Sequence, residues 1–262
     1  MLSLLALFNS PFTAAFLFFP WLQRDLGAWS FWGNFVRLKR QISKLLYAEI
    51  GERREQAEKR NDILSLLLSA SDEDGNPMTD EELHDELMTL MLGGNETTAT
   101  AMSWAFYWIH HLPEVREKLL QELATLDDSE DPTTISRLPY LTAVCNETLR
   151  IYPVSILTLQ RVAKEPIEIL GHRLEPGSDV VGSIYLLHHR QDLYPKSHEF
   201  RPERFLERQF TPYEFMPFGG GARRCVGEAL AMFEIKLVLT TILSCYKLAL
   251  VDQNQSKLLV GV

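Results

Sequence analysis

Most of this chain carries apolar residues at the three- to four-residue spacing of an α-helix. Proline, glycine or charged residues bound the periodic stretches, as is common at helix ends. The pattern predicts helices over residues 31–60, 63–68, 80–112, 113–126, 139–151 and 225–246. Thr79 and Glu82 have the spacing of a capping box, which places the start of the third helix at Asp80. We therefore expect a mainly helical protein.

After Pro153 the apolar residues change to the period of two that is typical of β-strands. This pattern predicts short strands at residues 157–162, 167–170 and 180–186. Turns are expected at Gly171-His172 and Pro176-Gly177. Loops or ordered irregular segments are expected at residues 71–78, 127–134 and 192–217. The predicted fold class is mainly α with small β-sheets.

The opening stretch, Met1 to Leu22, is strongly apolar, but it lacks the basic start of a signal peptide. Polar residues and Pro11 interrupt it, whereas a membrane-spanning helix needs about 20 consecutive apolar residues. A buried helix-loop-helix is therefore favoured over a membrane anchor.

The composition narrows the possible partners and metal sites. With 262 residues, 46% of them hydrophobic and 23% charged, the chain is typical of globular proteins. A formal net charge of -9 argues against nucleic acid as a partner. Cys145, Cys225 and Cys245 contain no C-x-x-C pair, so we expect a reducing compartment, without a disulfide framework or a four-ligand zinc site. Surface or satisfied core positions are expected for the histidines, His84, His110, His111, His172, His188, His189 and His198.

The helix predicted at residues 80–112 is apolar nearly all round, so we expect it to be buried. Gly93 and Gly94 in its middle cost ~1 kcal/mol each relative to alanine, and a buried Glu96 costs more unless it is paired. An acid beside an alcohol can pass protons into a dry pocket, which makes Glu96 and Thr97 candidate catalytic residues. A helix kink, in which a threonine hydroxyl bonds back to a preceding carbonyl, explains the same segment equally well.

Cys225 follows the glycines of residues 219–221 and stands beside Arg223 and Arg224, at the expected start of the last helix. The positive end of the helix dipole and the arginines both favour a thiolate over a thiol. A thiolate can ligate haem iron, and the glycines let backbone amides approach the sulfur. A buried structural cysteine, a reactive redox thiol and a phosphate-cradling loop are alternative interpretations.

Glu147 and Arg150 are three residues apart on a predicted helix, on the side opposite its apolar residues. Periodicity alone therefore favours an exposed ion pair, which contributes at most ~0.5 kcal/mol.

The order and spacing of these features resemble the cytochrome P450 family. Residues 218–227 read F-G-G-G-A-R-R-C-V-G and fit the family's haem-binding pattern F-G-x-G-x-R-x-C-x-G at every defined position. Residues 93–98 are similar to the oxygen-activation motif of the family's long central helix. Residues 147–150, E-T-L-R, look like its E-x-x-R motif, and residues 202–205 like its P-E-R-F motif. The likeness runs from about Leu7 to Leu250.

The resemblance implies a role for each of these residues. Cys225 would be the axial ligand of the iron in haem b. The other haem contacts would come from Arg161, Phe218, Gly219, Arg223 and Gly227. Glu96 and Thr97 would deliver protons. A buried triad supporting the cysteine loop, in place of an exposed pair, would be formed by Glu147, Arg150 and Arg204. Substrate would contact the helix before Gly93 and the residues Val154, Ser155, Ile156, Leu157 and Thr158.

The resemblance also implies a fold and a reaction. Residues 1–262 would form a single, incomplete cytochrome P450 domain that lacks the amino-terminal half of the family's usual chain. The reaction would insert one atom of O₂ into a hydrophobic organic substrate, with electrons from a ferredoxin or a reductase docked near Arg223 and Arg224. A peroxygenase or peroxide isomerase with the same haem site, and a truncated non-catalytic fragment, are the alternatives. Likeness to soluble bacterial members suggests the cytoplasm.

Overall fold

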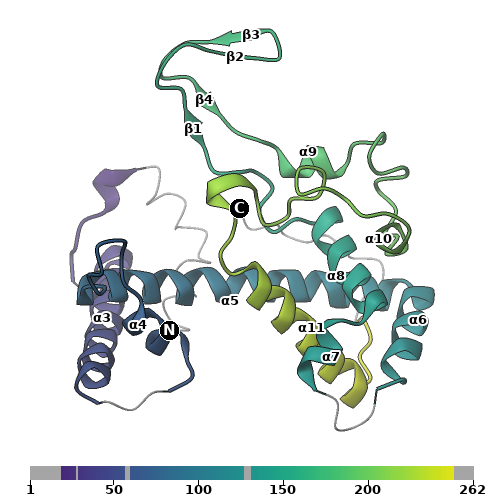
Figure 1. Cartoon of the computed structure of the whole chain (residues 1–262), viewed down its shortest axis with the longest axis horizontal. Coiled ribbons are helices and arrows are strands. Elements are labelled where there is room, and N and C mark those ends of the chain that lie inside the picture. Colours follow the sequence, from purple (N-terminus) through teal and green to yellow (C-terminus); the bar gives the residue numbers. More distant parts are fainter. Residues whose placement is uncertain (1–18, 28, 57–59, 127–130, 251–262) are drawn as a thin grey trace. The chain divides into compact units, whose positions relative to one another are not determined.

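The computed structural model describes residues 19–27, 29–56, 60–126 and 131–250, which divide between two compact units. The first unit comprises the described residues up to Glu96, and the second those from Thr97 (Figure 1). Helix α5 (Asp80–His111) supplies residues to both units. The helix-loop-helix predicted for residues 1–22 lies outside the described residues, except for its end, which includes the short 3-10 helix η1 (Pro20–Leu22).

The first unit is built on α3 (Phe31–Glu55), α4 (Ile63–Ser69) and the first half of α5. A small buried cluster of Ile50, Leu64 and Leu83 holds these three helices together. Helix α3 ends at Glu55 instead of Arg60, because the charged residues after Ile50 give it no further apolar face to bury.

The predicted start of α5 is confirmed. The hydroxyl of Thr79 accepts from the amide of Glu82 at 3.2 Å, and the Glu82 carboxylate accepts from the amide of Thr79 at 2.8 Å. These reciprocal bonds are the capping box expected from the sequence. The preceding loop at residues 71–78 is also confirmed, and a β-bridge between Ser71 and Pro77 closes it.

The middle turns of α5 are more exposed than the sequence predicts. Gly93, Gly94 and Asn95 are exposed, because the two buried clusters use only the flanking parts of the helix, Leu83 on one side and Ala101 to Ile109 on the other. The prediction of a helix buried all round is therefore wrong for these turns. Within the described ranges, no helix has the length and apolarity needed to cross a membrane.

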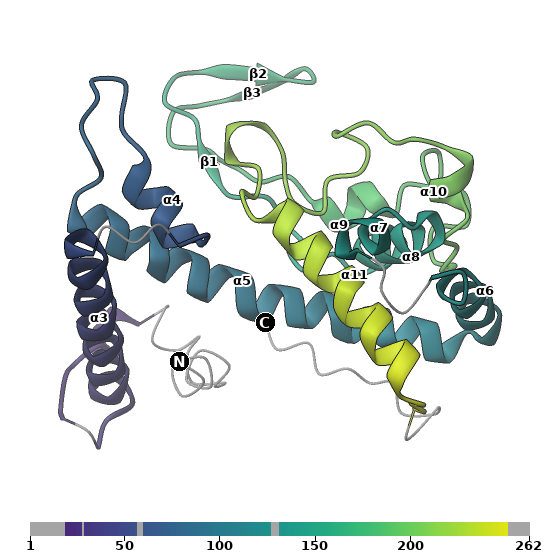
Figure 2. The ribbon, with the colours of Figure 1, turned by 60° about the horizontal axis from the view of Figure 1, so that its bottom comes forward.

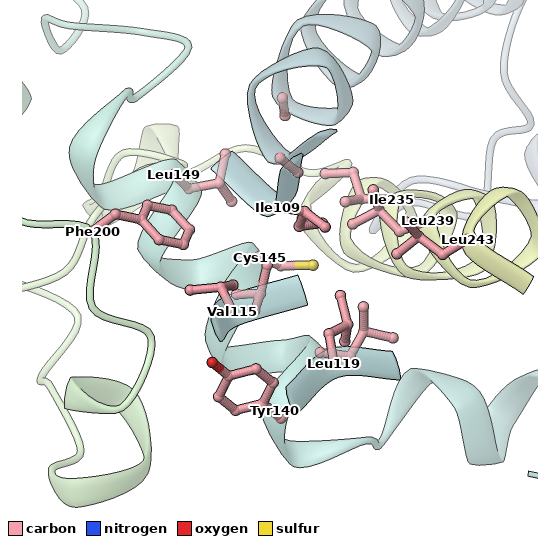
Figure 3. Packing of buried hydrophobic residues seen from close by; sticks show 14 of the residues in the cluster. Ile109, Val115, Leu119, Tyr140, Cys145, Leu149, Phe200, Ile235, Leu239 and Leu243 are labelled. Atoms are coloured by element: carbon pink, nitrogen blue, oxygen red, sulfur yellow. The ribbon is translucent and has the colours of Figure 1, made fainter. Parts of the chain in front are cut away.

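The second unit has the larger core, formed by the second half of α5 with α6 (Pro113–Leu123), α8 (Pro139–Ile151) and α11 (Glu228–Cys245). Figure 3 shows Ile109, Cys145 and Leu239 from three of these helices packed together. Helix α8 has the predicted bounds, and α6 is three residues shorter than predicted. The predicted loop at residues 127–134 is wrong at its end, where Asp131 caps the short helix α7 (Pro132–Ser136).

Among the described residues of the second unit, the strands form two antiparallel pairs, which extend as one arm (Figures 1 and 2). Strand β1 (Arg161–Val162) pairs with β4 (Asp179–Val180), and β2 (Ile167–Ile169) pairs with β3 (His172–Leu174). The turn between β2 and β3 lies at Leu170 and Gly171, whose φ angles are 51° and 79°, one residue before the predicted turn.

The strand predicted at residues 180–186 is wrong after Val180. Ser183 caps a short helix there, α9 (Ile184–His188), by accepting from the amide of Leu186 at 3.2 Å. The irregular segment expected after Asp192 is confirmed, apart from the single turn α10 (Arg204–Glu207).

Candidate functional site

Cys225 lies in a closed loop between the 3-10 turn η2 (Gly221–Arg223) and α11. Its amide donates to the carbonyl of Phe218 at 2.9 Å. Gly219 and Gly221 have φ angles of 73° and 65°, a conformation that other residues adopt only with strain. The loop therefore depends on these two glycines, and it presents the free cysteine exposed at its end.

The last helix begins later than the sequence predicts, so Cys225 is not in its first turn. Helix α11 begins at Glu228 with Gly227 as its N-cap. The sulfur of Cys225 therefore lies before the N-cap of the helix, outside the first turn in which the sequence placed it. Arg224 is turned to the carboxylate of Glu228, with donor–acceptor distances of 2.6 and 2.8 Å. The exposed guanidinium of Arg223 has no hydrogen-bond or ion-pair partner among the described residues.

The other residues expected to contact haem lie in the same loop and in β1. Phe218 is half-buried against the core of the second unit. A Cβ placed on Gly227 would lie 3.8 Å from the sulfur of Cys225, an ordinary contact. Arg161 is exposed on β1, where its guanidinium makes only long hydrogen bonds of 3.4 Å to the carbonyls of Leu159 and Gln160. Arg223 and Arg161 are thus both available to an anionic group.

Glu147, Arg150 and Arg204 lie together in the interior, with exposed fractions of 0%, 0% and 5%. The Glu147 carboxylate accepts from Nε and Nη2 of Arg150 at 2.7 and 2.8 Å, and Nε of Arg204 lies 3.0 Å from it. The amide of Arg201 donates to the same carboxylate at 2.8 Å. The prediction of an exposed ion pair is therefore wrong, because α10, which contains Arg204, and the irregular segment before it cover this side of α8.

This Glu147 cluster holds one carboxylate against two guanidinium groups, so backbone carbonyls satisfy the remaining donors. Arg150 Nη1 donates to the carbonyl of His188 at 2.8 Å. Arg150 and Arg204 also reach the carbonyl of Glu199, each at 3.4 Å. The cluster consequently fixes the backbone of the segment between α9 and α10, in agreement with the rule that buried charges are paired and hydrogen-bonded.

His188 is a buried residue whose contacts the sequence did not predict. Its Nδ1 lies 3.2 Å from the carbonyl of Arg150, and its Nε2 lies 3.0 Å from the amide of Met216, at the start of the cysteine loop. Burial lowers the pKa of His188 to about 4. No local motif could have revealed these contacts, because the partners are 38 and 28 residues away along the chain.

Glu96 and Thr97 occupy the middle turns of α5. Glu96 is half-buried, Thr97 is exposed and Thr98 is buried. The helix is continuous through these residues and through the exposed glycines before them. Glu96 belongs to the first unit and Thr97 to the second. The pair is therefore an acid and an alcohol on successive positions of one helix.

The segment expected to contact substrate precedes β1. Val154 packs against the core, whereas Ser155, Ile156 and Leu157 are exposed. Its backbone is fixed to the residues before α9, because the amide of Ile184 donates to the carbonyl of Ile156 at 3.0 Å. The exposed apolar side chains therefore stand on an ordered backbone.

Comparison with known proteins identifies the class of this protein. The family model for cytochrome P450 matches residues 1–260, and the chain belongs to this family. It is 41% identical to cytochrome P450 135B1 of Mycobacterium tuberculosis over 86% of the chain and 48% of that protein. It is 36% identical to cytochrome P450 4V2 of Mus musculus over 78% of the chain and 39% of that protein.

The fold agrees with a solved member of the family. Retinoic acid-bound cyanobacterial CYP120A1 superposes with a TM-score of 0.81 at 29% identity, over 90% of this chain and 55% of that one. The mainly helical fold with small sheets is thereby confirmed. The chain spans about half the length of the curated relatives it matches.

Proposed function

We propose that this chain is the haem-binding part of a cytochrome P450 monooxygenase, in which Cys225 would supply the thiolate ligand of the iron. The observation that carries the proposal is the exposed, free cysteine at the end of a glycine-dependent loop, next to a half-buried Phe218. A buried structural cysteine would need the opposite environment, which Cys145 has, since burial raises the pKa of its thiol to about 12. The sulfur of Cys225 is thus accessible to a ligand, whereas that of Cys145 is not.

The residues present fit a haem group. A thiolate-ligated haem needs an anionic sulfur for its iron and cations near its propionate carboxylates. Cys225 would supply the thiolate, and the exposed guanidinium of Arg223 would bind a propionate, with Arg161 as a second cation. Phe218, Gly219 and Gly227 would contact the haem near the sulfur of Cys225. A Cβ at position 227 would already be in van der Waals contact with that sulfur. When bound, haem would supply the chemistry by which one atom of O₂ enters the substrate and the other leaves as water.

The protein's own residues would then manage protons and substrate. Thr97 would hold a proton at its hydroxyl oxygen, and Glu96 would exchange that proton with solvent through its carboxylate. The exposed apolar side chains of Ile156 and Leu157 would orient a hydrophobic organic substrate, together with Val154 and Ser155. The retinoic acid bound to CYP120A1 belongs to that broad chemical class.

Electrons would come from a ferredoxin or a reductase. The cationic side chain of Arg223 beside the cysteine loop supports docking of an acidic protein surface there. Such an attraction between exposed charges weakens as salt is added, because a Debye length is about 10 Å at 0.1 M ionic strength.

The test is the absorption spectrum of the purified chain with added haem, reduced under carbon monoxide. We expect a strongly red-shifted Soret band, its loss in Cys225→Ala, and its retention in Cys245→Ala, which removes the other exposed free cysteine. Absence of the band from the unaltered chain, or its survival in Cys225→Ala, would contradict the proposed ligand.

A haem-binding but non-catalytic chain is the second candidate. The exposed middle of α5 favours it, since Gly93 and Gly94 are exposed in the part of the chain that the structure describes, and proton delivery from Glu96 requires a dry pocket. Oxygen consumption and product formation, measured with a chemical reductant and hydrophobic substrates, distinguish the two candidates. Product formation supports the monooxygenase, whereas a red-shifted Soret band without any product supports the second candidate.

A further inference from the structure

We propose that His188 is a positioning residue that holds the entry of the cysteine loop to the Glu147 cluster. The proposal rests on the proposed function in one respect, namely that the loop carries the haem ligand. The side chain of His188 is fully buried. Among the described contacts, one ring nitrogen hydrogen-bonds to Arg150 and the other to Met216, so the ring links these two residues.

The two partners of the imidazole determine its protonation state. A backbone carbonyl can only accept and a backbone amide can only donate. Nδ1 of His188 must therefore carry a hydrogen and donate to the carbonyl of Arg150, and Nε2 must be unprotonated and accept from the amide of Met216. The ring is consequently neutral, with one defined tautomer.

Two hydrogen bonds join Arg150 and His188. Nη1 of Arg150 donates to the carbonyl of His188 at 2.8 Å, and the ring of His188 lies 3.2 Å from the carbonyl of Arg150. The ring also stacks on Phe215, with centroids 5.4 Å apart and an interplanar angle of 28°. His188 is thus fixed on the side of α8 and on the side of the loop.

The contacts continue from His188 to the cysteine. Met216 accepts at its carbonyl from the amide of Gly219 at 3.0 Å, and Phe218 accepts from the amide of Cys225 at 2.9 Å. The bond to the Met216 amide therefore anchors the point where this closed loop begins. Without it, a part-buried amide would lose its partner, and we expect the loop to open without unfolding of α8.

Hydrogen–deuterium exchange of the haem-free chain tests the anchoring directly. His188→Phe keeps an aromatic ring against Phe215 but removes both hydrogen bonds. We expect the amides of residues 216–225 to exchange at least about tenfold faster, with α6 and α8 changed much less. His188→Gln, which retains a donor and an acceptor, should recover part of the protection.

Two controls separate positioning from general loss of stability. His189→Phe alters the neighbouring histidine, whose ring, among the described residues, has its hydrogen bond to the carbonyl of Tyr185 in α9 and none to the cysteine loop. Leu243→Ala removes a buried leucine at the far end of α11. Neither control should increase exchange in residues 216–225 selectively. Unchanged exchange there in His188→Phe, or the same pattern in Leu243→Ala, would overturn the proposal.

Haem loading gives the second measurement. At equal haem content, we expect the red-shifted Soret band of the reduced carbon monoxide complex to lose intensity in His188→Phe relative to Leu243→Ala. If the unaltered chain lacks this band while the exchange result is as expected, the proposed function fails and the anchoring role stands. If the band is present and equal in both variants, His188 does not position the ligand.

Discussion

At the scale of single residues, Glu147 is the buried anion that balances two buried guanidinium groups. Its carboxylate is fully buried between Arg150 and Arg204 and also accepts from the amide of Arg201. Two buried guanidinium groups thus share one counter-charge. Removal of a buried counter-charge leaves the others unpaired in a medium of low dielectric constant, which is costly.

We predict that Glu147→Gln destabilises the second unit by about 3–5 kcal/mol, because it leaves two buried cations without an anion. Urea denaturation monitored by circular dichroism measures the change. The matched control is Glu207→Gln, which breaks an exposed pair with Arg201 and should change stability by less than ~1 kcal/mol. Equal effects of the two substitutions would show that the buried pair is no more important than the exposed one.

His188 gives a prediction about pH. Burial lowers its pKa from 6.5 to about 4, so between these values the unfolded chain binds the proton more readily than the folded chain. Stability should therefore fall as the pH is lowered from 6.5 to 4, by at most ~1.4 kcal/mol per pH unit for one proton, and this loss should level off below pH 4.

The difference in unfolding free energy between the unaltered chain and His188→Phe isolates this group. It should be constant above pH 6.5 and should shrink as the pH falls towards 4, since the variant has no ring nitrogen to protonate. Denaturation at a series of pH values measures it. A difference that stays the same over that range would mean that His188 titrates normally in the folded protein.

At the scale of helices and strands, α8 depends on a side chain from another helix at its start. Pro139 occupies the first turn of α8, and Leu138 provides no side-chain cap. The carboxylate of Glu122 in α6 accepts instead from the amides of Tyr140 and Leu141, at 2.7 and 2.8 Å. A negative charge at this end also complements the helix dipole.

We predict that Glu122→Ala destabilises the second unit by about 0.5–2 kcal/mol, the usual range for loss of a helix cap. Glu117→Ala, an exposed position on the same helix, should change stability by less than ~0.5 kcal/mol. Thermal unfolding of both variants checks the difference. A loss of stability in Glu117→Ala as large as that in Glu122→Ala would indicate a general effect of charge on α6.

These elements also show what a sequence can predict. The start of α8 followed from a proline at its first turn, and the start of α5 from a capping box, because both signals lie within a few residues of the helix end. The strand expected after Val180 was wrong, because apolar alternation competed with a serine cap at Ser183. The cysteine loop could be recognised because its residues are contiguous. The contacts of His188 could not, because its partners come from two distant segments.

At the scale of the whole chain, the apolar core formed by the described residues is divided unequally between the two units. The first has the small cluster of Ile50, Leu64 and Leu83, whereas the second buries residues from four helices around Ile109 and Leu239. Apolar burial is the main favourable contribution to folding, at about 25 cal/mol per Å². Local opening should therefore require less free energy in the first unit.

We predict that backbone amides in α4 and in the second half of α3 exchange with deuterium at least about tenfold faster than those in α8 and α11, a factor that corresponds to ~1.4 kcal/mol of opening free energy. Leu83→Ala should raise exchange in α3 and α4, and Leu239→Ala should raise it in α8 and α11, because the two leucines belong to separate clusters. Exchange that rises equally in all four helices with either substitution would mean that the chain opens as one cooperative unit. Their shared helix α5 would then transmit each loss to both clusters, and a defect in the first unit would loosen the cysteine loop as well.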